Sequence, residues 1–115
     1  MSDEDGRHWT LEAAREIIAD VRKRTQRAVQ QSDELVAERD AMSEKAPERA
    51  KADEQIQAVV SRWAREMEAL GLEVKGLWLV DFDNGDGYYC WQWPETDLAH
   101  YHGYDEGFAA RVRIQ

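Results

Sequence analysis

The hydrophobic residues of this 115-residue chain change their spacing at Gly71, and this change constrains the fold most. Before Gly71 they recur every three to four residues, which is the period of an amphipathic helix. After it they alternate in short aromatic runs separated by glycines, as in half-buried strands. Helices followed by strands predict an α+β fold. We predict one domain, with a tail at 1–9, a helical hairpin at 10–71 and a β-rich part at 72–115.

Two long helices joined by a short loop are predicted for the first part. Thr10 is a favourable N-cap residue, and Glu12 follows in the first turn, where the helix dipole favours an anion. Residues 43–47 interrupt the pattern, a second helix covers about 47–70, and Gly71 suits a left-handed C-cap. The predicted core-facing stripe of the first helix comprises Ala14, Ile18, Val21, Thr25, Ala28, Ser32, Leu35 and Met42, and Arg39 occupies the one stripe position between Leu35 and Met42. The stripe of the second helix comprises Ile56, Val60, Trp63, Met67 and Leu70.

An antiparallel hairpin of this kind buries one seam and leaves the other side of each stripe uncovered. The uncovered side needs another layer, supplied either by the C-terminal part or by a second copy of the hairpin. The heptad-like spacing is that of a coiled coil. We therefore predict a homodimer, formed through the helices or through the aromatic sheet. A basic group is interpreted as a solvated helix face, and it comprises Arg22, Lys23, Arg24 and Arg27.

A small antiparallel three-stranded sheet is predicted for the second part. Residues 77–82 and 88–93 are rich in aromatic and branched side chains, and residues 83–87 between them contain Asn-Gly and Asp-Gly turn signals. The two signals leave the register of these strands open. Residues 98–102 form the third predicted strand, and residues 112–115 are a candidate for a further short edge strand.

Charge and composition exclude several classes of protein. The chain carries 24 acidic and 15 basic residues and a net charge of −9, whereas a nucleic-acid binder needs a basic face. The longest apolar run, at residues 77–80, is far shorter than the roughly 20 residues that a membrane span needs. Cys90 is the only cysteine, and the acidic N-terminus lacks the apolar region of a signal peptide. We predict a cytoplasmic protein that binds neither nucleic acid nor membrane.

Four segments, in order, resemble a prokaryotic protein family. Residues 101–111, Tyr-His-Gly-Tyr-Asp-Glu-Gly-Phe-Ala-Ala-Arg, resemble its signature of an aromatic residue and His, two spacers, Asp, one spacer and Gly-Phe-Ala-Gly-Arg. Residues 9–14, residues 74–76 with 79–82, and residues 90–91 agree as well. The chain is thus similar to the domain-of-unknown-function family number 2203. Ala110 and Gln92 depart from it, since Gly and Arg are usual there. The resemblance implies a helical hairpin with a small sheet, and no activity.

The C-terminal signature contains the candidate ligand site. Arg111 is able to hold a carboxylate or phosphate through two hydrogen bonds, or to form a structural ion pair with Asp105 or Asp81. Gly107 is expected to adopt a backbone conformation that a side chain would forbid. The segment either locks the C-terminus onto the sheet or bounds a small-ligand pocket. That pocket would comprise His102, Asp105, Arg111, Trp91 and Trp93.

Two histidines suggest metal chemistry more weakly. His100 and His102 would point to the same face of a strand, about 7 Å apart, which suits two ligands of one ion. A third ligand would come from Asp105, Glu106, Cys90 or Asp81. A hydrogen-bonded structural His102 is the favoured interpretation, so no metal ion is predicted. Residues 81–87 fail the spacing of a calcium loop and are interpreted as a turn.

No catalytic residue and no cofactor is predicted. Cys90 has no partner at C-x-x-C spacing and is interpreted as a buried, inert thiol. The chain contains no G-x-S-x-G, Walker, G-x-G-x-x-G or H-E-x-x-H motif. The aromatic residues after Gly71 exceed what one face of a small sheet buries, which favours an interface or a pocket there. We predict a non-enzymatic interaction or assembly module. The alternative is a small-ligand or metal-binding protein, with enzymatic activity left open, whose site lies on the C-terminal sheet.

Overall fold

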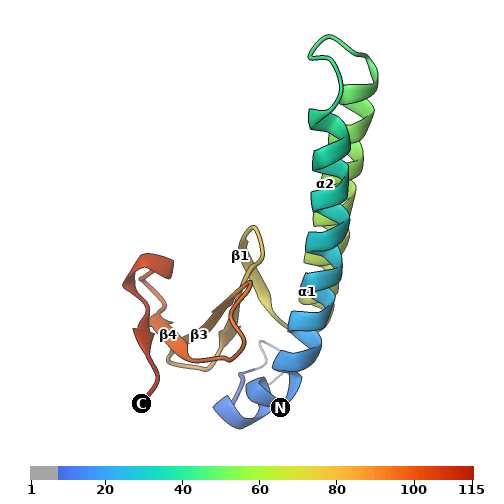
Figure 1. The fold of residues 1–115 in the computed structure, drawn as a ribbon. Helices are drawn as coiled ribbons and strands as arrows, with labels where there is room; N and C mark the ends of the chain where they lie inside the picture. The colour runs from blue at the N-terminus through green and yellow to red at the C-terminus, as the bar shows by residue number, and fades with distance from the viewer. Residues whose placement is uncertain (1–7) are drawn as a thin grey trace.

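The computed structural model describes residues 8–115, so residues 1–7 of the predicted tail lie outside the described part. The elements follow in the order α1 (Leu11–Asp40), α2 (Glu48–Ala69), β1 (Glu73–Gly76), β2 (Leu79–Asp83), β3 (Gly87–Gln92), β4 (His100–Gly103), the 3-10 helix η2 (Phe108–Ala110) and β5 (Val112–Arg113). The helices form a hairpin, and the strands form one antiparallel sheet beside its lower half (Figure 1). The predicted α+β class and the helical hairpin are confirmed.

The helices begin and end close to the predicted residues. The amide of Ala13 donates a hydrogen bond to the Thr10 hydroxyl at 3.0 Å, which satisfies one of the free amides of the first turn of α1. Gly71 follows α2 with a φ of 94°, the left-handed conformation expected after a helix end. The buried seam contains Ala14, Val21, Thr25 and Ala28 of α1 with Ala52, Val59, Trp63 and Met67 of α2.

A buried polar pair fixes the middle of this seam. The indole Nε1 of Trp63 donates a hydrogen bond to the Thr25 hydroxyl at 2.8 Å. The Thr25 hydroxyl in turn donates to the carbonyl oxygen of Val21 at 2.8 Å. The indole N–H of Trp63 and the hydroxyl of Thr25 therefore both have hydrogen-bond partners, as buried polar groups generally do. The small side chains at this point leave room for the large indole.

The sheet has five strands in the order β1-β2-β3-β4-β5, so the predicted number of three is wrong. β1 escapes sequence analysis because its residues, Glu-Val-Lys-Gly, include one apolar side chain and show no alternation. β5 is the short edge strand suggested for residues 112–115, and Val112 pairs with Tyr101 of β4. The additional strands widen the sheet on both sides of the predicted three.

Two of the predicted strands begin too early. Leu77 and Trp78 lie in the turn between β1 and β2, where Trp78 has a φ of 60°, uncommon for a residue with a side chain. The ring of Trp78 packs edge-on against Trp63 with 5.0 Å between ring centres, and this contact offsets the unfavourable backbone conformation. β4 likewise begins at His100, after a segment that buries Leu98 completely.

Residues 83–87 form the predicted turn between β2 and β3. The side-chain oxygen of Asn84 accepts hydrogen bonds from the amides of Asp86 and Gly87, both at 2.8 Å. Gly85 has a φ of 94°, which a side chain would disfavour. The register that the sequence leaves open places Asp81 opposite Cys90, and Cys90 opposite His100.

The core lies between the apolar face of the sheet and the lower half of the hairpin. Its largest members from the sheet and the loops are Phe82, Trp91 and Leu98, all without solvent exposure. The molecule extends 52 Å along its longest axis, because the tip half of the hairpin projects beyond the sheet (Figure 1). Over residues 8–115, neither helix combines the length and the apolar character that crossing a membrane requires.

Candidate functional site

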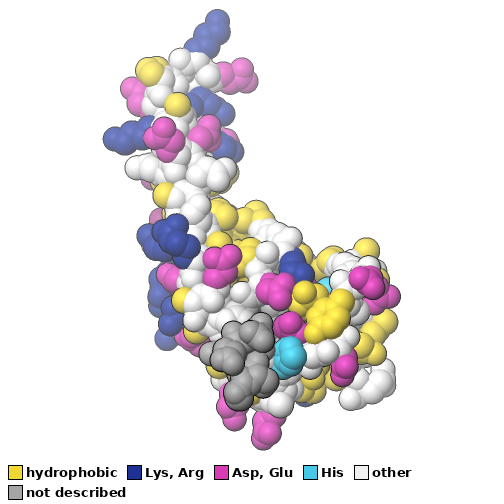
Figure 2. All heavy atoms as spheres, turned by 180° about the vertical axis from the view of Figure 1, so that it is seen from behind, with side chains coloured by type: hydrophobic (Ala, Val, Ile, Leu, Met, Phe, Trp, Pro, Cys, Tyr) yellow, Lys and Arg dark blue, Asp and Glu magenta, His cyan; other side chains and the backbone are white. Residues whose placement is uncertain are grey.

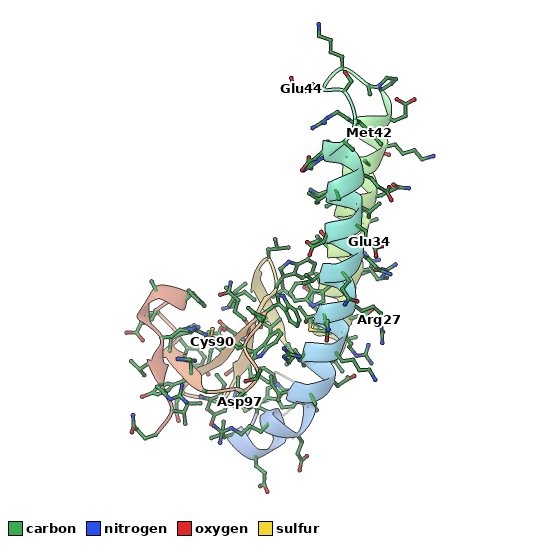
Figure 3. The ribbon with its side chains drawn as sticks, in the orientation of Figure 1. Arg27, Glu34, Met42, Glu44, Cys90 and Asp97 are labelled. Carbon is green, nitrogen blue, oxygen red and sulfur yellow. The ribbon has the colours of Figure 1, made fainter. Side chains whose placement is uncertain are left out.

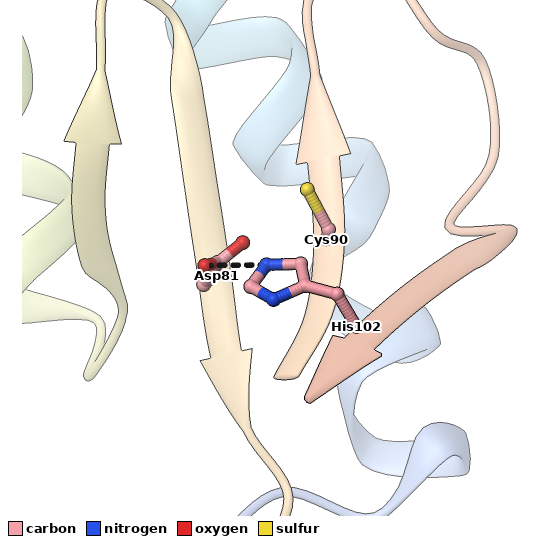
Figure 4. Close-up of side chains that lie close together, drawn as sticks. All are labelled: Asp81, Cys90 and His102. Carbon is pink, nitrogen blue, oxygen red and sulfur yellow. Dashed lines mark hydrogen bonds and ion pairs between the residues drawn. The ribbon is translucent and has the colours of Figure 1, made fainter. Parts of the chain in front are cut away.

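The sheet has an apolar face that packs against the helical hairpin and an opposite face that carries buried polar side chains. On β2, Val80 and Phe82 face the hairpin, while Asp81 between them points to the opposite face. Cys90 on β3 and His102 on β4 point to that same face. Figure 4 shows the three side chains converging from three neighbouring strands. We call Asp81, Cys90 and His102 the sheet cluster; all three are buried, and their ligand-type atoms lie within 4.8 Å of one another.

His102 is held by two hydrogen-bond acceptors. Its Nε2 lies 3.0 Å from Oδ2 of Asp81, and its Nδ1 lies 2.9 Å from the carbonyl oxygen of Gly103. A carbonyl oxygen can only accept, so Nδ1 carries a hydrogen. The contact between Nε2 and the carboxylate then needs a second proton, or a cation in place of that proton. A metal-ligating histidine commonly has this arrangement, with its other ring nitrogen donating to a backbone carbonyl.

Asp81 has one oxygen in use and one without a partner. Oδ2 contacts His102 and also lies 3.5 Å from the ammonium nitrogen of Lys75. Oδ1 is buried and has no hydrogen-bond partner among the described residues. A buried carboxylate oxygen without a partner is costly, and it is free to bind a cation.

Lys75 supplies the positive charge beside the cluster. Its ammonium group lies 3.5 Å from a carboxylate oxygen of Glu73 and 3.9 Å from the centre of the Tyr88 ring. Burial lowers the pKa of Lys75, but the negative charges of Asp81 and Glu73 outweigh it and raise the pKa above its ordinary value. Lys75 is not among the predicted site residues, because it lies beside Asp81 only through the pairing of β1 with β2.

Cys90 is a protonated thiol near neutral pH. Burial raises its pKa to about 12, and the negative charge of Asp81 acts in the same direction. A thiol of this kind is a poor nucleophile, in line with the inert thiol that the sequence suggests. A bound cation would reverse the local electrostatics and favour the thiolate as its ligand.

A second group of contacts lies at the ends of β3 and β4. The Arg111 guanidinium pairs with Glu95 through two contacts, at 2.9 and 3.2 Å. It also lies 4.1 Å from the centre of the Phe108 ring. Arg111 thus forms a structural ion pair, one of the two alternatives for this residue, but its partner is Glu95 and not Asp105 or Asp81. Glu95 also accepts a hydrogen bond from the amide of Gln92 at 2.9 Å, so Arg111 ties the C-terminal segment to the end of β3.

The predicted ligand residues do not form one pocket. His102 belongs to the sheet cluster, whereas Trp91 is buried on the opposite face. Trp93 packs under the guanidinium of Arg22, at 5.0 Å. Asp105 is exposed in the turn that follows β4.

His100 and Gly107 also differ from the roles that the sequence suggests. His100 shares a strand face with His102 but is not part of the cluster; its Nδ1 lies 3.8 Å from a carboxylate oxygen of Glu95. Gly107 has a φ of −119°, and apart from its own atoms and its two chain neighbours no described heavy atom lies within 4 Å of the place where a Cβ would be. The expectation that Gly107 needs a conformation forbidden to side chains is therefore wrong.

A pocket of about 290 Å³ opens beside the cluster. Its lining comprises Lys75, Leu79, Asp81, Cys90, His102, Glu106, Gly107 and Phe108. Glu106 is exposed, and one of its carboxylate oxygens accepts a hydrogen bond from the amide of Gly103 at 2.8 Å. Three ligand-type atoms on one side and open space on the other form a site that can hold an ion and still admit a small molecule.

The chain matches the model of a known protein family. The model of a family described as "Uncharacterized conserved protein (DUF2203)" matches residues 7–114. No curated protein and no solved structure matches the chain.

Proposed function

The chain belongs to the DUF2203 family of uncharacterized conserved proteins, and we propose that it binds a divalent transition-metal ion, of the zinc class, through Asp81, Cys90 and His102. The observation that carries the proposal is the convergence of one carboxylate, one thiol and one imidazole from three strands within 4.8 Å. Ligands around a tetrahedral zinc ion lie about 3 to 4 Å apart, so small side-chain movements would close the site.

The surroundings of the cluster support a metal ion over a purely structural ion pair. The unpartnered Oδ1 of Asp81 would gain a partner, and the proton that Nε2 of His102 needs would be replaced by the ion. The hydrogen bond from Nδ1 to Gly103 already orients the imidazole for ligation. Sulfur, nitrogen and oxygen ligands together favour zinc, cobalt or iron over magnesium or calcium.

The fourth coordination position would face the pocket of about 290 Å³. Glu106 lines this pocket, but its carboxylate is exposed and accepts a hydrogen bond from the Gly103 amide. Glu106 is therefore not counted as the fourth ligand. A site with three protein ligands and one open position resembles catalytic and ligand-binding zinc centres more than closed structural ones. Lys75 would lie beside any molecule bound there.

Cobalt titration tests this proposal. Protein freed of metal by chelation is titrated with Co²⁺, and we expect saturation at one ion per chain with a thiolate-to-cobalt charge-transfer band. Cys90→Ser should abolish that band, and His102→Ala should weaken binding more than about tenfold. His100→Ala is the matched control, since it removes a histidine from the same strand face outside the cluster. The absence of saturable binding, or an unchanged band in Cys90→Ser, would overturn the proposal.

The hairpin favours a second function, that of an interaction or assembly protein. Its tip half projects beyond the sheet, and the groove between the helices there has a volume of about 380 Å³. An amphipathic hairpin with an uncovered side is stabilised when another helical layer covers it. Sedimentation of the full chain over a range of concentrations tests this function. A protein that stays monomeric at every concentration and binds no partner protein would overturn it.

A further inference from the structure

One stripe of α1, half-buried at Arg24 and exposed beyond it, has basic residues toward the sheet and acidic residues toward the tip. Its members follow one another at spacings of three and four residues, so their side chains lie along one face of the helix. From the sheet toward the tip they are Arg24, Arg27, Gln31, Glu34 and Glu38. Figure 3 labels Arg27 at the level of the sheet and Glu34 farther toward the tip. Figure 2 shows Lys and Arg side chains along the whole length of the hairpin, with Asp and Glu side chains among them toward the tip.

The stripe borders a groove between the two helices. Two adjoining hollows, of about 230 and 380 Å³, have Gln31 and Arg62 in common among their lining residues. Leu35, Val59 and the exposed small residue Ala58 line the hollow nearer the tip. A small side chain there lets another helix approach closely.

We propose that this face is the contact between two copies of the chain, related by a two-fold axis at Gln31 with their α1 helices antiparallel. About that axis Arg27 of one copy meets Glu34 of the other, and Arg24 meets Glu38. Each pair occurs twice, because a two-fold contact is self-complementary. A parallel arrangement would instead place like charges opposite each other, which is unfavourable. The inference rests on the assembly function and is independent of the metal site.

The remaining charged groups near the axis are compatible with this arrangement. Arg24 already contacts Asp20 at 2.9 Å and Glu66 at 3.4 Å within its own copy. Arg27 and Glu34, by contrast, have no ion-pair partner within the described part of the chain and are exposed. Arg62 donates a hydrogen bond to the side-chain oxygen of Gln31 within its own copy, so it lies level with the axis, and it lines the same hollow as Glu34. Arg27 and Glu34 are therefore the pair to test.

Charge reversal in the full chain tests the contact. Arg27→Glu and Glu34→Lys should each weaken dimerisation about tenfold, measured by sedimentation, because two attractive pairs become repulsive. The double variant should restore the wild-type affinity, and an equimolar mixture of the two single variants should form the heterodimer. Raising the salt concentration should weaken the wild-type dimer. Circular dichroism checks that these exposed positions leave the fold intact.

Cysteine cross-linking tests the orientation. Gln31→Cys should form a disulfide-linked dimer on mild oxidation, because the two copies meet at this residue. Glu38→Cys should not, since an antiparallel pair separates the two positions by about 21 Å along the helices. Cross-linking through Glu38→Cys would show a parallel pair and overturn the proposed arrangement.

The sedimentation results separate the two levels of the proposal. A dimer whose affinity is unchanged in Arg27→Glu would overturn the hairpin contact and leave the assembly function standing. A monomer at every concentration would overturn both. Restoration in the double variant would support the Arg27–Glu34 pair specifically.

Discussion

The Nε2 of His102 lies 3.0 Å from Oδ2 of Asp81, and this contact joins β4 to β2 across the intervening strand β3. Neighbouring strands are held by backbone hydrogen bonds, whereas this pair links strands that are not neighbours. Both side chains are almost completely buried, at 3% and 1% exposure. The pair therefore fastens the middle of the sheet and leaves Oδ1 of Asp81 for another partner.

Removal of the Asp81 carboxylate should destabilise the fold. Asp81→Ala leaves His102 and Lys75 without their common partner, and we expect the free energy of unfolding to fall by about 3 kcal/mol. Urea denaturation measures the change. Asp86→Ala, at an exposed turn position, is the control and should change stability by less than about 0.5 kcal/mol. Equal effects of the two substitutions would contradict the central role of the buried pair.

The raised pKa of Cys90, about 12, predicts slow thiol chemistry. At pH 8 the folded, metal-free protein should react with a thiol-specific disulfide reagent far more slowly than the urea-unfolded chain, and its rate should rise with pH. Comparable rates in the folded and unfolded states would contradict the burial and charge effects on this group.

The same pKa shift predicts the pH dependence of stability. In the metal-free protein the folded state retains the Cys90 proton to higher pH than the unfolded state, whose thiol has a pKa of about 8.5. The free energy of unfolding should therefore be highest below pH 8 and decrease as the pH rises toward 12. Cys90→Ala should remove this part of the decrease, as measured by denaturation at pH 7 and pH 10.

Two glycines near the cluster should differ in how far alanine destabilises the fold. A Cβ on Gly87 would lie 2.6 Å from the carbonyl oxygen of His102, a backbone atom that cannot move without disturbing the pairing of β3 with β4. Gly87→Ala should therefore cost about 2 kcal/mol or more of stability. Gly107→Ala meets open space and should change stability by less than about 0.5 kcal/mol. Thermal unfolding compares the two variants, and a reversed order would contradict the packing at Gly87.

The ion pair of Arg111 with Glu95 should hold the C-terminal segment. Arg111→Ala should increase the hydrogen exchange of the Ile114 amide, which donates to the carbonyl oxygen of Ala99, while the exchange of α1 stays unchanged. Arg111→Lys should restore little, because lysine cannot form the two-pronged contact. Unchanged exchange at Ile114 in Arg111→Ala would show that the strand pairing holds the segment without the ion pair.

Much of the fold follows from local patterns. Thr10, the three- and four-residue spacing and Gly71 locate both helices, because caps and amphipathic stripes are properties of short segments. The predicted number of strands is wrong because β1 has only one apolar residue among four and so shows no alternation. The turn at Trp78 is not predicted either, because its left-handed backbone is stabilised by the ring of Trp63, which is distant in sequence.

The candidate site, like the fold, combines residues that the sequence predicts with an arrangement that depends on the tertiary structure. The sequence marks His102 and offers Asp81 and Cys90 among several third ligands, but it also suggests Trp91 and Asp105 for a ligand pocket. The choice depends on the strand register, which turns Asp81, Cys90 and His102 to one face and Trp91 to the other. Successive side chains of a strand point to opposite faces of the sheet. A shift of the strand register by one residue would therefore move the side chains of that strand to the other face.

The sequence by itself determined the two halves of this protein, the hairpin and its caps, and the alternating strands after Gly71, because these depend on residues close together in the chain. Only the tertiary structure decided which polar side chains meet. Asp81 and His102 are 21 residues apart and belong to strands that do not pair with each other, so their contact exists only once β3 has aligned them. Contacts of that kind depend on the register of several strands at once, and no local pattern encodes it.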